Sequence, residues 1–363
     1  MNPDFWKGKR VFITGHTGFK GGWLSLWLQS LGAEVHGYSL SPPTSPNLFS
    51  VARIGEGMAS STIADIRDFE QLAATLRKVQ PEIVLHLAAQ PLVRYSYQNP
   101  AETYAVNVMG VVNLLEAARA TVGIKALVNV TTDKCYENRE WPWGYRENEA
   151  LGGHDPYSSS KGCAELVTAA YRNSFLASAG IAVATARAGN VIGGGDWAAE
   201  RLLPDILGAI DSGTPLLIRS PGAVRPWQHV LEPLSGYLTL AERLHGDGKA
   251  FAEAWNFGPA DEDAQTVGWI LEQVALRNPR LAWRIATTGQ PHEAIHLKLD
   301  SSKARARLPW RPRWCLQTAL SNTLDWHRAW RNGCDMRAGT LAQIDEHLIC
   351  PSTSDRQTDN GSL

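Results

Sequence analysis

The first half of the chain alternates short aliphatic segments with longer segments that have helical periodicity. The predicted strands are residues 10–13, 34–38, 61–64, 82–87, 126–131 and 182–187. The predicted helices are residues 23–31, 69–79, 103–121 and 157–176. A long loop is predicted over the Pro-, Ser- and Gly-rich residues 41–58. Such alternation is typical of βαβ units, whose parallel strands are buried on both faces. The sequence therefore predicts an α/β fold with a doubly wound parallel sheet of the Rossmann, dinucleotide-binding type.

The pattern changes after residue 190, where Gly, Pro and Trp clusters interrupt shorter elements. We expect a dinucleotide-binding domain over residues 1–188 and a smaller C-terminal substrate domain over 189–230 and 259–347. Residues 231–258 are expected to pack back on the first domain. Residues 351–363 form a polar tail, which we expect to be disordered.

Composition excludes several classes of protein. The chain has 363 residues, 44% of them hydrophobic, and its 35 Lys and Arg nearly balance 36 Asp and Glu. This composition supports a sizeable core and argues against nucleic-acid binding by bulk charge. No apolar run reaches the roughly 18 residues of a membrane span, and the N-terminus has no signal-peptide core. Five cysteines without a CxxC pair favour neither a zinc site nor disulfides. We therefore expect a cytoplasmic protein without a metal, a membrane or a nucleic-acid partner.

A glycine-rich turn joins the first predicted strand to the first predicted helix. Gly15, Gly18 and Gly21 are spaced three residues apart in this turn. Glycines let the backbone approach a pyrophosphate closely, and the helix N-terminus stabilises the negative charge. Glycine spacing alone is weak evidence, because the same residues also allow close packing of a strand on a helix.

The second strand ends without the acidic residue that usually bonds the adenosine ribose. The stretch from Tyr38 to Ser41 holds neither a carboxylate nor an arginine that would take a 2′-phosphate. Ser39 is left as a weaker partner for the ribose. This favours NAD over NADP modestly and predicts looser retention of the cofactor than an aspartate would give.

A tyrosine and a lysine four residues apart provide acid–base chemistry. Tyr157 and Lys161 share one face of a predicted helix. The charge of Lys161, helped by an oxidised nicotinamide nearby, lowers the pKa of Tyr157. Tyr157 is then able to take the proton of a sugar hydroxyl while a hydride leaves. Thr131 and Thr132, at the end of the fifth strand, strengthen this interpretation.

These motifs together resemble the extended short-chain dehydrogenase/reductase superfamily. Longer strings are similar to the nucleotide-sugar 4,6-dehydratases that act on CDP-D-glucose, and the resemblance runs from about residue 6 to 347. The strings are residues 88–94, 132–136, 143–149, 189–197 and 225–230. The resemblance implies a hydro-lyase of deoxysugar biosynthesis, as in O-antigen and lipopolysaccharide synthesis. Such an enzyme oxidises C4, removes water across C5 and C6 and returns the hydride to C6, giving CDP-4-keto-6-deoxy-D-glucose.

The resemblance also implies roles for individual residues. The implied catalytic residues are Thr132, Asp133, Lys134, Tyr157 and Lys161. The implied NAD-binding residues are Gly15, Thr17, Gly18, Phe19, Gly21, Ser39, Asp65, Ile66, Ala88, Ala89, Asn107, Tyr157 and Lys161. The implied substrate-binding residues are Asn190, Arg201 and Arg225. The family pairs its two long helices, here residues 103–121 and 157–176, in a homodimer, and a homotetramer is the alternative.

One residue departs from the wider dehydratase pattern. Relatives acting on dTDP-glucose carry a glutamate base where this chain has Lys134, and a protonated lysine cannot accept the C5 proton. A neutral Lys134, a role for Lys134 in stabilising an enolate, and Tyr157 as the base all stay open. Asp133 suits the acid that protonates the leaving oxygen, or it caps a turn. Arg201 binds phosphate or is an ordinary solvated charge.

Two other functions are compatible with the same scaffold. A nucleotide-sugar 4-epimerase needs the hydroxyl, Tyr157 and Lys161 but not the pair Asp133 and Lys134, which disfavours it. A non-catalytic dinucleotide sensor usually lacks a catalytic residue, whereas Thr132, Tyr157 and Lys161 are all present. Fold alone does not decide among these functions.

Overall fold

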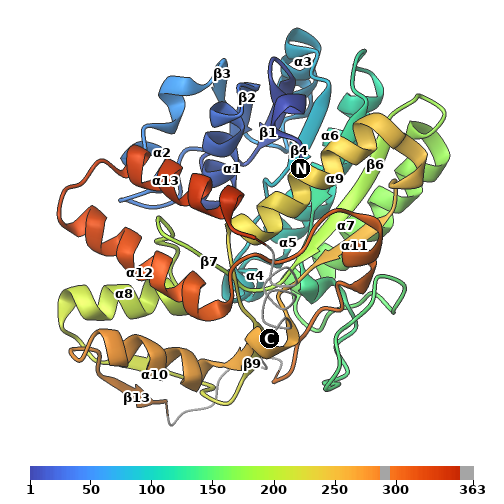
Figure 1. The fold of residues 1–363 in the computed structure, drawn as a ribbon. Helices are drawn as coiled ribbons and strands as arrows, with labels where there is room; N and C mark the ends of the chain where they lie inside the picture. The colour runs from blue at the N-terminus through green and yellow to red at the C-terminus, as the bar shows by residue number, and fades with distance from the viewer. Residues whose placement is uncertain (287–294, 352–363) are drawn as a thin grey trace, which may run out of the picture.

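A seven-stranded parallel sheet forms the centre of the molecule (Figure 1). The computed structural model describes residues 1–286 and 295–351, so all but the first residue of the predicted disordered tail lies outside the described residues. The strand order is β11-β6-β5-β4-β1-β2-β3. The strands are β1 (Arg10–Thr14), β2 (Glu34–Ser39), β3 (Ser60–Ile63), β4 (Ile83–His86), β5 (Ala126–Val130), β6 (Ala182–Ala188) and β11 (Ala254–Phe257). The predicted doubly wound α/β fold is confirmed.

Helices cover both faces of this sheet. The helices are α1 (Phe19–Ser30), α2 (Leu48–Val51), α3 (Phe69–Val79), α4 (Val93–Gln98), α5 (Pro100–Tyr104), α6 (Gly110–Arg119), α7 (Pro156–Tyr171), α8 (Leu202–Ser212), α9 (Leu231–Asp247), α10 (Val267–Arg277), α11 (Ser302–Arg307), α12 (Leu316–Arg331) and α13 (Met336–Ile349). Successive residues of β1 face opposite layers: Val11 and Ile13 pack in the core under α1 and α9, and Phe12 packs in the core under α3, α6 and α7.

Four helical segments differ from the sequence prediction, the first being α1, which begins at Phe19 rather than at residue 23. The predicted loop 41–58 contains α2 and a short 3₁₀ turn, Ile54–Gly57. Helix α4 was not anticipated. The predicted helix 103–121 begins earlier, at Pro100, and contains the π-helical turn Ala105–Met109 between α5 and α6. Both α2 and α4 are short, and short helices carry little periodicity for a sequence pattern to detect.

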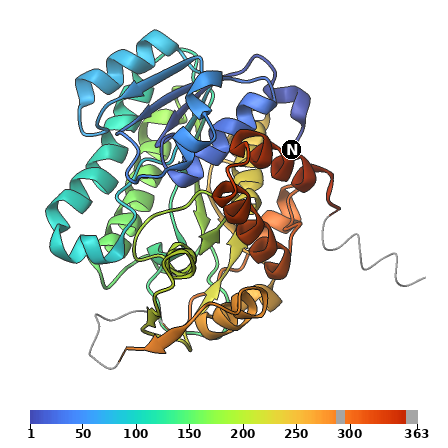
Figure 2. The same ribbon diagram turned by 90° about the vertical axis from the view of Figure 1, so that its left-hand side faces the viewer.

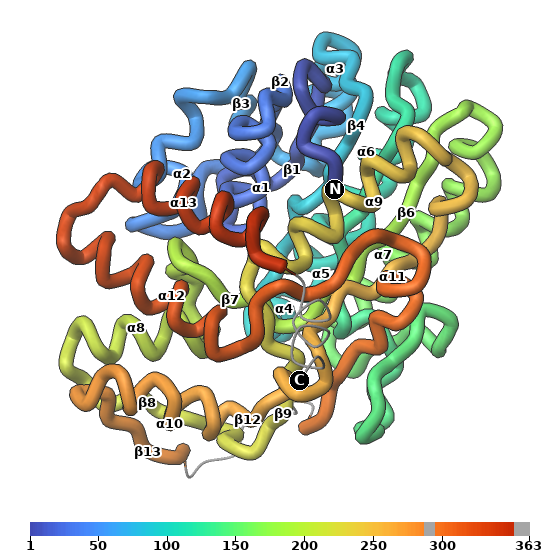
Figure 3. The backbone as a smooth tube through the Cα atoms, viewed as in Figure 1, coloured from blue at the N-terminus to red at the C-terminus, as the bar shows by residue number. Residues whose placement is uncertain are grey.

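The chain leaves the sheet after β6 and returns to it. Helix α9 packs on β5 and β6, and β11 pairs with β6 as an edge strand. Besides β11, the described residues after β6 form six short strands. These strands are β7 (Val191–Ile192), β8 (Leu216–Ile218), β9 (Val224–Pro226), β10 (Gln228–His229), β12 (Ala264–Thr266) and β13 (Trp283–Ile285). Helices α8 and α10 lie with β8, β9, β12 and β13 in the lower part of Figure 3.

The C-terminal helices join two cores. Leu320 of α12 packs with α8 and α10, whereas Trp326 of the same helix packs in the core of the sheet. Met336 and Ile344 of α13 also belong to the sheet core, and α13 lies against α1 (Figure 2). The sequence assigned this segment to the substrate domain, and the division into domains stays a prediction. Within residues 1–286 and 295–351, no helix is both long and apolar enough to cross a membrane.

Candidate active site

A cavity of about 1230 Å³ opens at the carboxyl end of the sheet. Its walls are the glycine turn, the ends of β2, β4, β5 and β6, the start of α7, and the segment that leaves the sheet after β6. Ligands of open α/β sheets bind at this end of the strands, so the topology places the cavity where a dinucleotide site is expected.

The glycine turn has the close backbone contacts that a phosphate site requires. Gly15 adopts φ +80°, and a Cβ there would lie 2.8 Å from the backbone nitrogen of Ala88. A Cβ on Gly21 would overlap the carbonyl oxygen of Gly15. Gly18 is the N-cap of α1 and offers no side-chain cap, which leaves the first N–H groups of the helix for an anion. The turn therefore fits a dinucleotide pyrophosphate.

The cavity wall beside β2 has a hydroxyl where related folds carry a carboxylate. Thr17 donates its hydroxyl proton to the carbonyl of Leu40 at 2.8 Å and lies 2.8 Å from the Ser39 hydroxyl oxygen. Ser39 is consequently the donor to Thr17, and its own oxygen is left to accept a bond from a ligand. Asp65 also lines the cavity, but Arg67 binds its carboxylate at 2.6 Å and holds its pKa low.

Tyr157 and Lys161 lie together on the first turns of α7, whose N-cap is Asp155. Burial raises the pKa of Tyr157 to about 12, against a hydrogen bond with Thr132 that lowers it. Burial lowers the pKa of Lys161 to about 8, and Glu165 opposes this shift. In the protein by itself, burial thus outweighs the expected lowering of the Tyr157 pKa. A role for an oxidised nicotinamide in that lowering stays a prediction.

Asp133 lies at the start of a short 3₁₀ turn and is only 2% exposed. Thr132 donates to its Oδ1 atom at 2.8 Å, whereas Oδ2 is buried with no hydrogen-bond partner among the described residues. Thr132 is the N-cap of the turn and accepts from the backbone nitrogen of Lys134. Since capping falls to Thr132, the free oxygen of Asp133 favours a chemical role over the capping alternative. Lys134, the next residue, also lines the cavity.

The three predicted substrate residues also line the cavity. Arg225 is 3% exposed and donates to the carbonyl of Val224 at 2.9 Å. Arg201, at the N-cap of α8, pairs with Asp196 at 3.1 Å and is partly exposed. The structure brings Asn190, Arg201 and Arg225 together within one cavity with the predicted catalytic residues.

Asn107 is the predicted cofactor residue that does not line the cavity. Its side chain accepts from the backbone nitrogen of Gln90 at 2.8 Å and donates to the Gln90 carbonyl and to Ser160. Asn107 therefore fixes the loop that carries Ala88 and Ala89 against α7, from behind the cavity wall.

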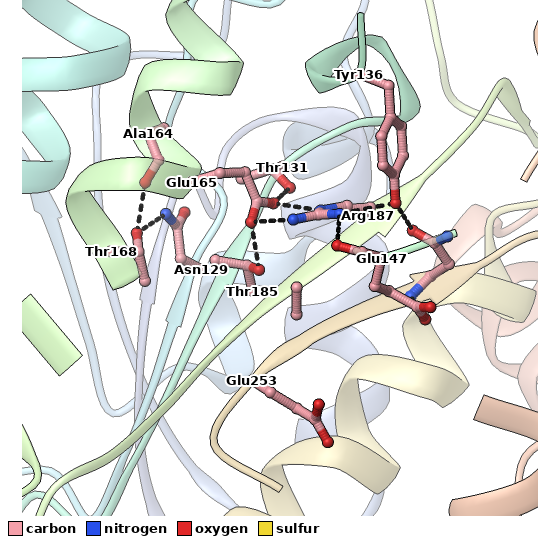
Figure 4. Close-up of polar contacts among 12 residues, drawn as sticks. Asn129, Thr131, Tyr136, Glu147, Ala164, Glu165, Thr168, Thr185, Arg187 and Glu253 are labelled. Atoms are coloured by element: carbon pink, nitrogen blue, oxygen red, sulfur yellow. Dashed lines mark hydrogen bonds and ion pairs between the residues drawn. The ribbon is translucent and has the colours of Figure 1, made fainter. Parts of the chain in front are cut away.

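A buried ion pair joins β6 to α7, the helix that carries Tyr157 and Lys161 (Figure 4). Arg187 of β6 binds Glu165 of α7 at 2.8 Å, and both side chains are 3% exposed. Glu165 also accepts from Thr131 and Thr185, and Arg187 also donates to the hydroxyl of Tyr136. Burial acts against both charges, yet the pair lowers the pKa of Glu165 and raises that of Arg187. Sequence reasoning missed this pair.

Sequence reasoning also missed Lys20 and Asp196 as cavity residues. Lys20 stands inside the glycine turn motif, and Asp196 stands inside the Gly-Gly-Gly-Asp-Trp string. The available signal was a charged residue within each motif. Only the fold shows that both side chains face the same cavity.

Comparisons with known proteins agree with this architecture. The family model for GDP-mannose 4,6 dehydratase matches residues 12–323. A CDP-glucose 4,6-dehydratase of Salmonella typhimurium is 54% identical over 96% of this chain and 98% of its own length. A dTDP-glucose 4,6-dehydratase of Xanthomonas campestris is 27% identical over 87% of this chain and 92% of its own.

Solved structures share the fold at lower identity. A UDP-glucose-4-epimerase of Stenotrophomonas maltophila superposes with a TM-score of 0.77 at 22% identity, covering 90% of this chain and all of its own. A dTDP-glucose 4,6-dehydratase of Streptomyces venezuelae superposes with a TM-score of 0.74 at 22% identity, covering 90% of this chain and 99% of its own. The match of the family model over most of the chain, with the identity to the Salmonella enzyme, shows that the chain belongs to the GDP-mannose 4,6 dehydratase family.

Proposed function

We propose that the chain catalyses the NAD-dependent 4,6-dehydration of CDP-D-glucose to CDP-4-keto-6-deoxy-D-glucose. The observation that carries this proposal is the convergence of Thr132, Asp133, Tyr157 and Lys161 on one cavity beside a phosphate-binding turn. The 54% identity to a CDP-glucose 4,6-dehydratase, over nearly the whole of both chains, supports the choice of CDP-D-glucose.

The residues of the cavity fit a dinucleotide. The turn around Gly18 and the N-terminus of α1 would hold the pyrophosphate, and Ser39 would accept from the adenosine ribose. Tyr157 and Lys161 would hold the nicotinamide ribose. When bound, NAD⁺ accepts the hydride from C4 of the sugar and later returns it to C6.

Tyr157 begins the reaction by taking the proton from the C4 hydroxyl. Thr132 lies within hydrogen-bonding distance of Tyr157, so both hydroxyl groups would contact the same substrate oxygen. Lys161 stabilises the phenolate by its charge, and Glu165 helps to keep that charge in place. Oxidation at C4 gives a ketone, and this ketone makes the neighbouring C5 proton acidic.

Asp133 completes the elimination by protonating the leaving oxygen at C6. Its Oδ2 atom has no partner among the described residues and lies close to Gly189, where a Cβ would approach it to 3.0 Å. Two residues of the cavity wall are candidates for the base that takes the C5 proton: a neutral Lys134, or Tyr157 after it has given up the proton that it took from the C4 hydroxyl. The C6 hydroxyl leaves as water with the proton from Asp133, and the base returns its proton to C5 as the hydride is added at C6.

Two arginines of the cavity wall suit the substrate pyrophosphate. Arg225 and Arg201 present guanidinium groups to the cavity, and guanidinium binds phosphate oxygens in pairs. Asn190 lies at the start of this wall, and its carbonyl accepts from the backbone nitrogen of Gln228 at 3.0 Å. We assign these three residues to substrate binding.

The test is incubation of the purified chain with NAD⁺ and, separately, CDP-, dTDP-, UDP- and GDP-glucose. Mass spectrometry then measures the loss of one water from the sugar nucleotide. We expect loss from CDP-glucose. Loss only from another nucleotide would overturn the substrate, and a sugar inverted at C4 without loss of water would point to an epimerase.

The Asp133→Asn variant tests the division of labour within the cavity. The amide keeps the size of the side chain, but its N–H is far too weak an acid to protonate a leaving oxygen. We expect C4 oxidation to persist, with NADH absorbance building up, while water loss falls by about 10²-fold or more. Near-normal water loss would remove Asp133 from the acid role.

We also assign a homodimer to this chain, built from the helical segments 100–119 and 156–176. Large apolar side chains are exposed along them: Tyr104, Met109, Leu166 and Phe175. Exposed apolar side chains gathered on neighbouring helices suit a contact with a second copy. Light scattering on the purified chain gives the mass, and Leu166→Glu is expected to shift it towards the monomer.

A further inference from the structure

Lys20 is a cation at the point where the glycine turn becomes helix α1. It is the second residue of the helix, one residue before Gly21. Its side chain lines the same cavity as Asp133 and Lys161. The reaction steps assigned above give it no role.

The ammonium group of Lys20 stands among other charged groups of the cavity. Burial lowers the pKa of Lys20 to about 8, and the nearby charges of Arg201 and Lys161 lower it further. Asp133 and Asp196 act in the opposite direction. The surroundings therefore contain two cations and two carboxylates in addition to Lys20.

Neither of the two carboxylates forms a hydrogen bond or an ion pair with Lys20. Asp196 is bound by Arg201 at 3.1 Å, and Asp133 accepts from Thr132 at 2.8 Å. Across residues 1–286 and 295–351, no hydrogen bond or ion pair holds the Lys20 ammonium group. Within these ranges the protein itself therefore does not engage Lys20, which is left to interact with a ligand of the cavity.

The position of Lys20 relates it to both ends of the cofactor site. Its helix carries the N-terminus assigned to the pyrophosphate, and its side chain lines the same cavity as Lys161, assigned to the nicotinamide ribose. We infer that Lys20 sets the balance between the two redox states of the bound cofactor, by disfavouring the oxidised, positively charged nicotinamide relative to the reduced one. This inference rests on the proposed NAD-dependent reaction.

The physical reason is repulsion between like charges in a poorly solvated site. Oxidised nicotinamide carries a positive charge that it loses when a hydride arrives, so a fixed cation nearby disfavours only the oxidised form. The hydride comes from C4 of the sugar, and the proton of the C4 hydroxyl goes to Tyr157. Lys20 therefore favours the first hydride transfer and weakens retention of NAD⁺.

Binding of NAD⁺ and NADH to the full chain, measured separately by calorimetry at fixed salt, tests the inference without turnover. The variants are Lys20→Met, which removes the charge and keeps the length, and Lys20→Gln as a second neutral form. Lys20→Arg keeps the charge. Lys78→Met, on the exposed side of α3, is the matched control.

We expect both neutral variants to lower the ratio of Kd for NAD⁺ to Kd for NADH by about tenfold. Lys20→Arg and Lys78→Met are expected to leave this ratio unchanged. Equal weakening of both cofactors would make Lys20 a phosphate ligand and overturn the inference, as would an unchanged ratio. An unvaried chain that binds neither dinucleotide would overturn the proposed function itself, and the inference with it.

Discussion

Two groups of charged residues in the molecule differ in how completely they are paired. Arg187 and Glu165 are sealed between α7 and β6, 3% exposed, with hydrogen bonds to neighbouring hydroxyl groups. Lys20, Asp196 and Arg201 face the cavity, with one ion pair among three charges.

The difference separates charges that serve the fold from charges that serve a ligand. A buried charge with every partner supplied by the protein stabilises one arrangement of helix and strand. A charge facing a cavity with its partners incomplete keeps part of its interaction energy for binding. Removing a residue from each group therefore has different consequences for stability and for turnover.

The largest expected effect is a loss of turnover on substitution of Tyr157, which lines the same cavity. Tyr157→Phe removes the hydroxyl that takes the C4 proton, and we expect kcat to fall by about 10²- to 10⁴-fold. The melting temperature is expected to stay close to that of the unchanged chain, because the ring still packs in place. A rate within a few-fold of normal would remove Tyr157 from the base role.

The largest expected effect on stability comes from breaking the sealed pair. Arg187→Met leaves Glu165 buried with hydroxyl partners only, which is expected to cost about 3–5 kcal/mol of unfolding free energy. Urea unfolding at neutral pH measures this change.

A double variant separates the pair from its surroundings. Glu165→Leu with Arg187→Met removes both charges together, so the unfolding free energy is expected to fall by less than in either single variant. If the double variant lost the sum of the two single losses, the two charges would not stabilise one another.

The pH dependence of kcat/KM sharpens the link between the sealed pair and Lys161. The pKa of Lys161 lies at about 8, so the activity is expected to fall as the pH rises through this value and the ammonium loses its proton. Glu165 raises this pKa, so Glu165→Gln is expected to move the alkaline limb to lower pH, by about one unit or less. A limb that did not move, or that moved to higher pH, would contradict a charge effect of Glu165 on Lys161.

The smallest expected effect on stability is at Arg201. Its pair with Asp196 is partly exposed, so Arg201→Gln is expected to cost less than about 1 kcal/mol of unfolding free energy. The KM for the sugar nucleotide is expected to rise about tenfold if the guanidinium binds phosphate. An unchanged KM in steady-state assays would favour the alternative that Arg201 is an ordinary surface charge.

The strands and long helices of the sheet were predictable because their residues carry a local pattern. Ile83–His86 reads as a continuous apolar run and is buried on both faces. The seventh strand, β11, was included in a segment expected to pack back, but its place beside β6 depends on a pairing about 70 residues apart. Such long-range pairings leave no periodic signal in the sequence.

The site shows the same division. The sequence predicted one dinucleotide-dependent site from recognisable spacings, namely those of the glycine turn and of Tyr157 and Lys161. Glu165 follows Lys161 by one helical turn, so it was visible as a residue but not as a partner of Arg187, whose strand comes later. Lys20 was hidden among glycines. Pairing and the direction of a side chain arise only when distant elements meet.

The return of the chain to the sheet makes the two halves of the molecule depend on each other. A fragment ending at residue 189 would lack α9 and β11, so β6 would become a bare edge and the apolar residues beneath α9 would meet water. Such a fragment is expected to aggregate rather than to hold dinucleotide as a separate module. Its complement, residues 190–363, would lose helix α1, against which α13 packs. The glycine turn and the segment that follows β6 are therefore expected to fold only as parts of one unit.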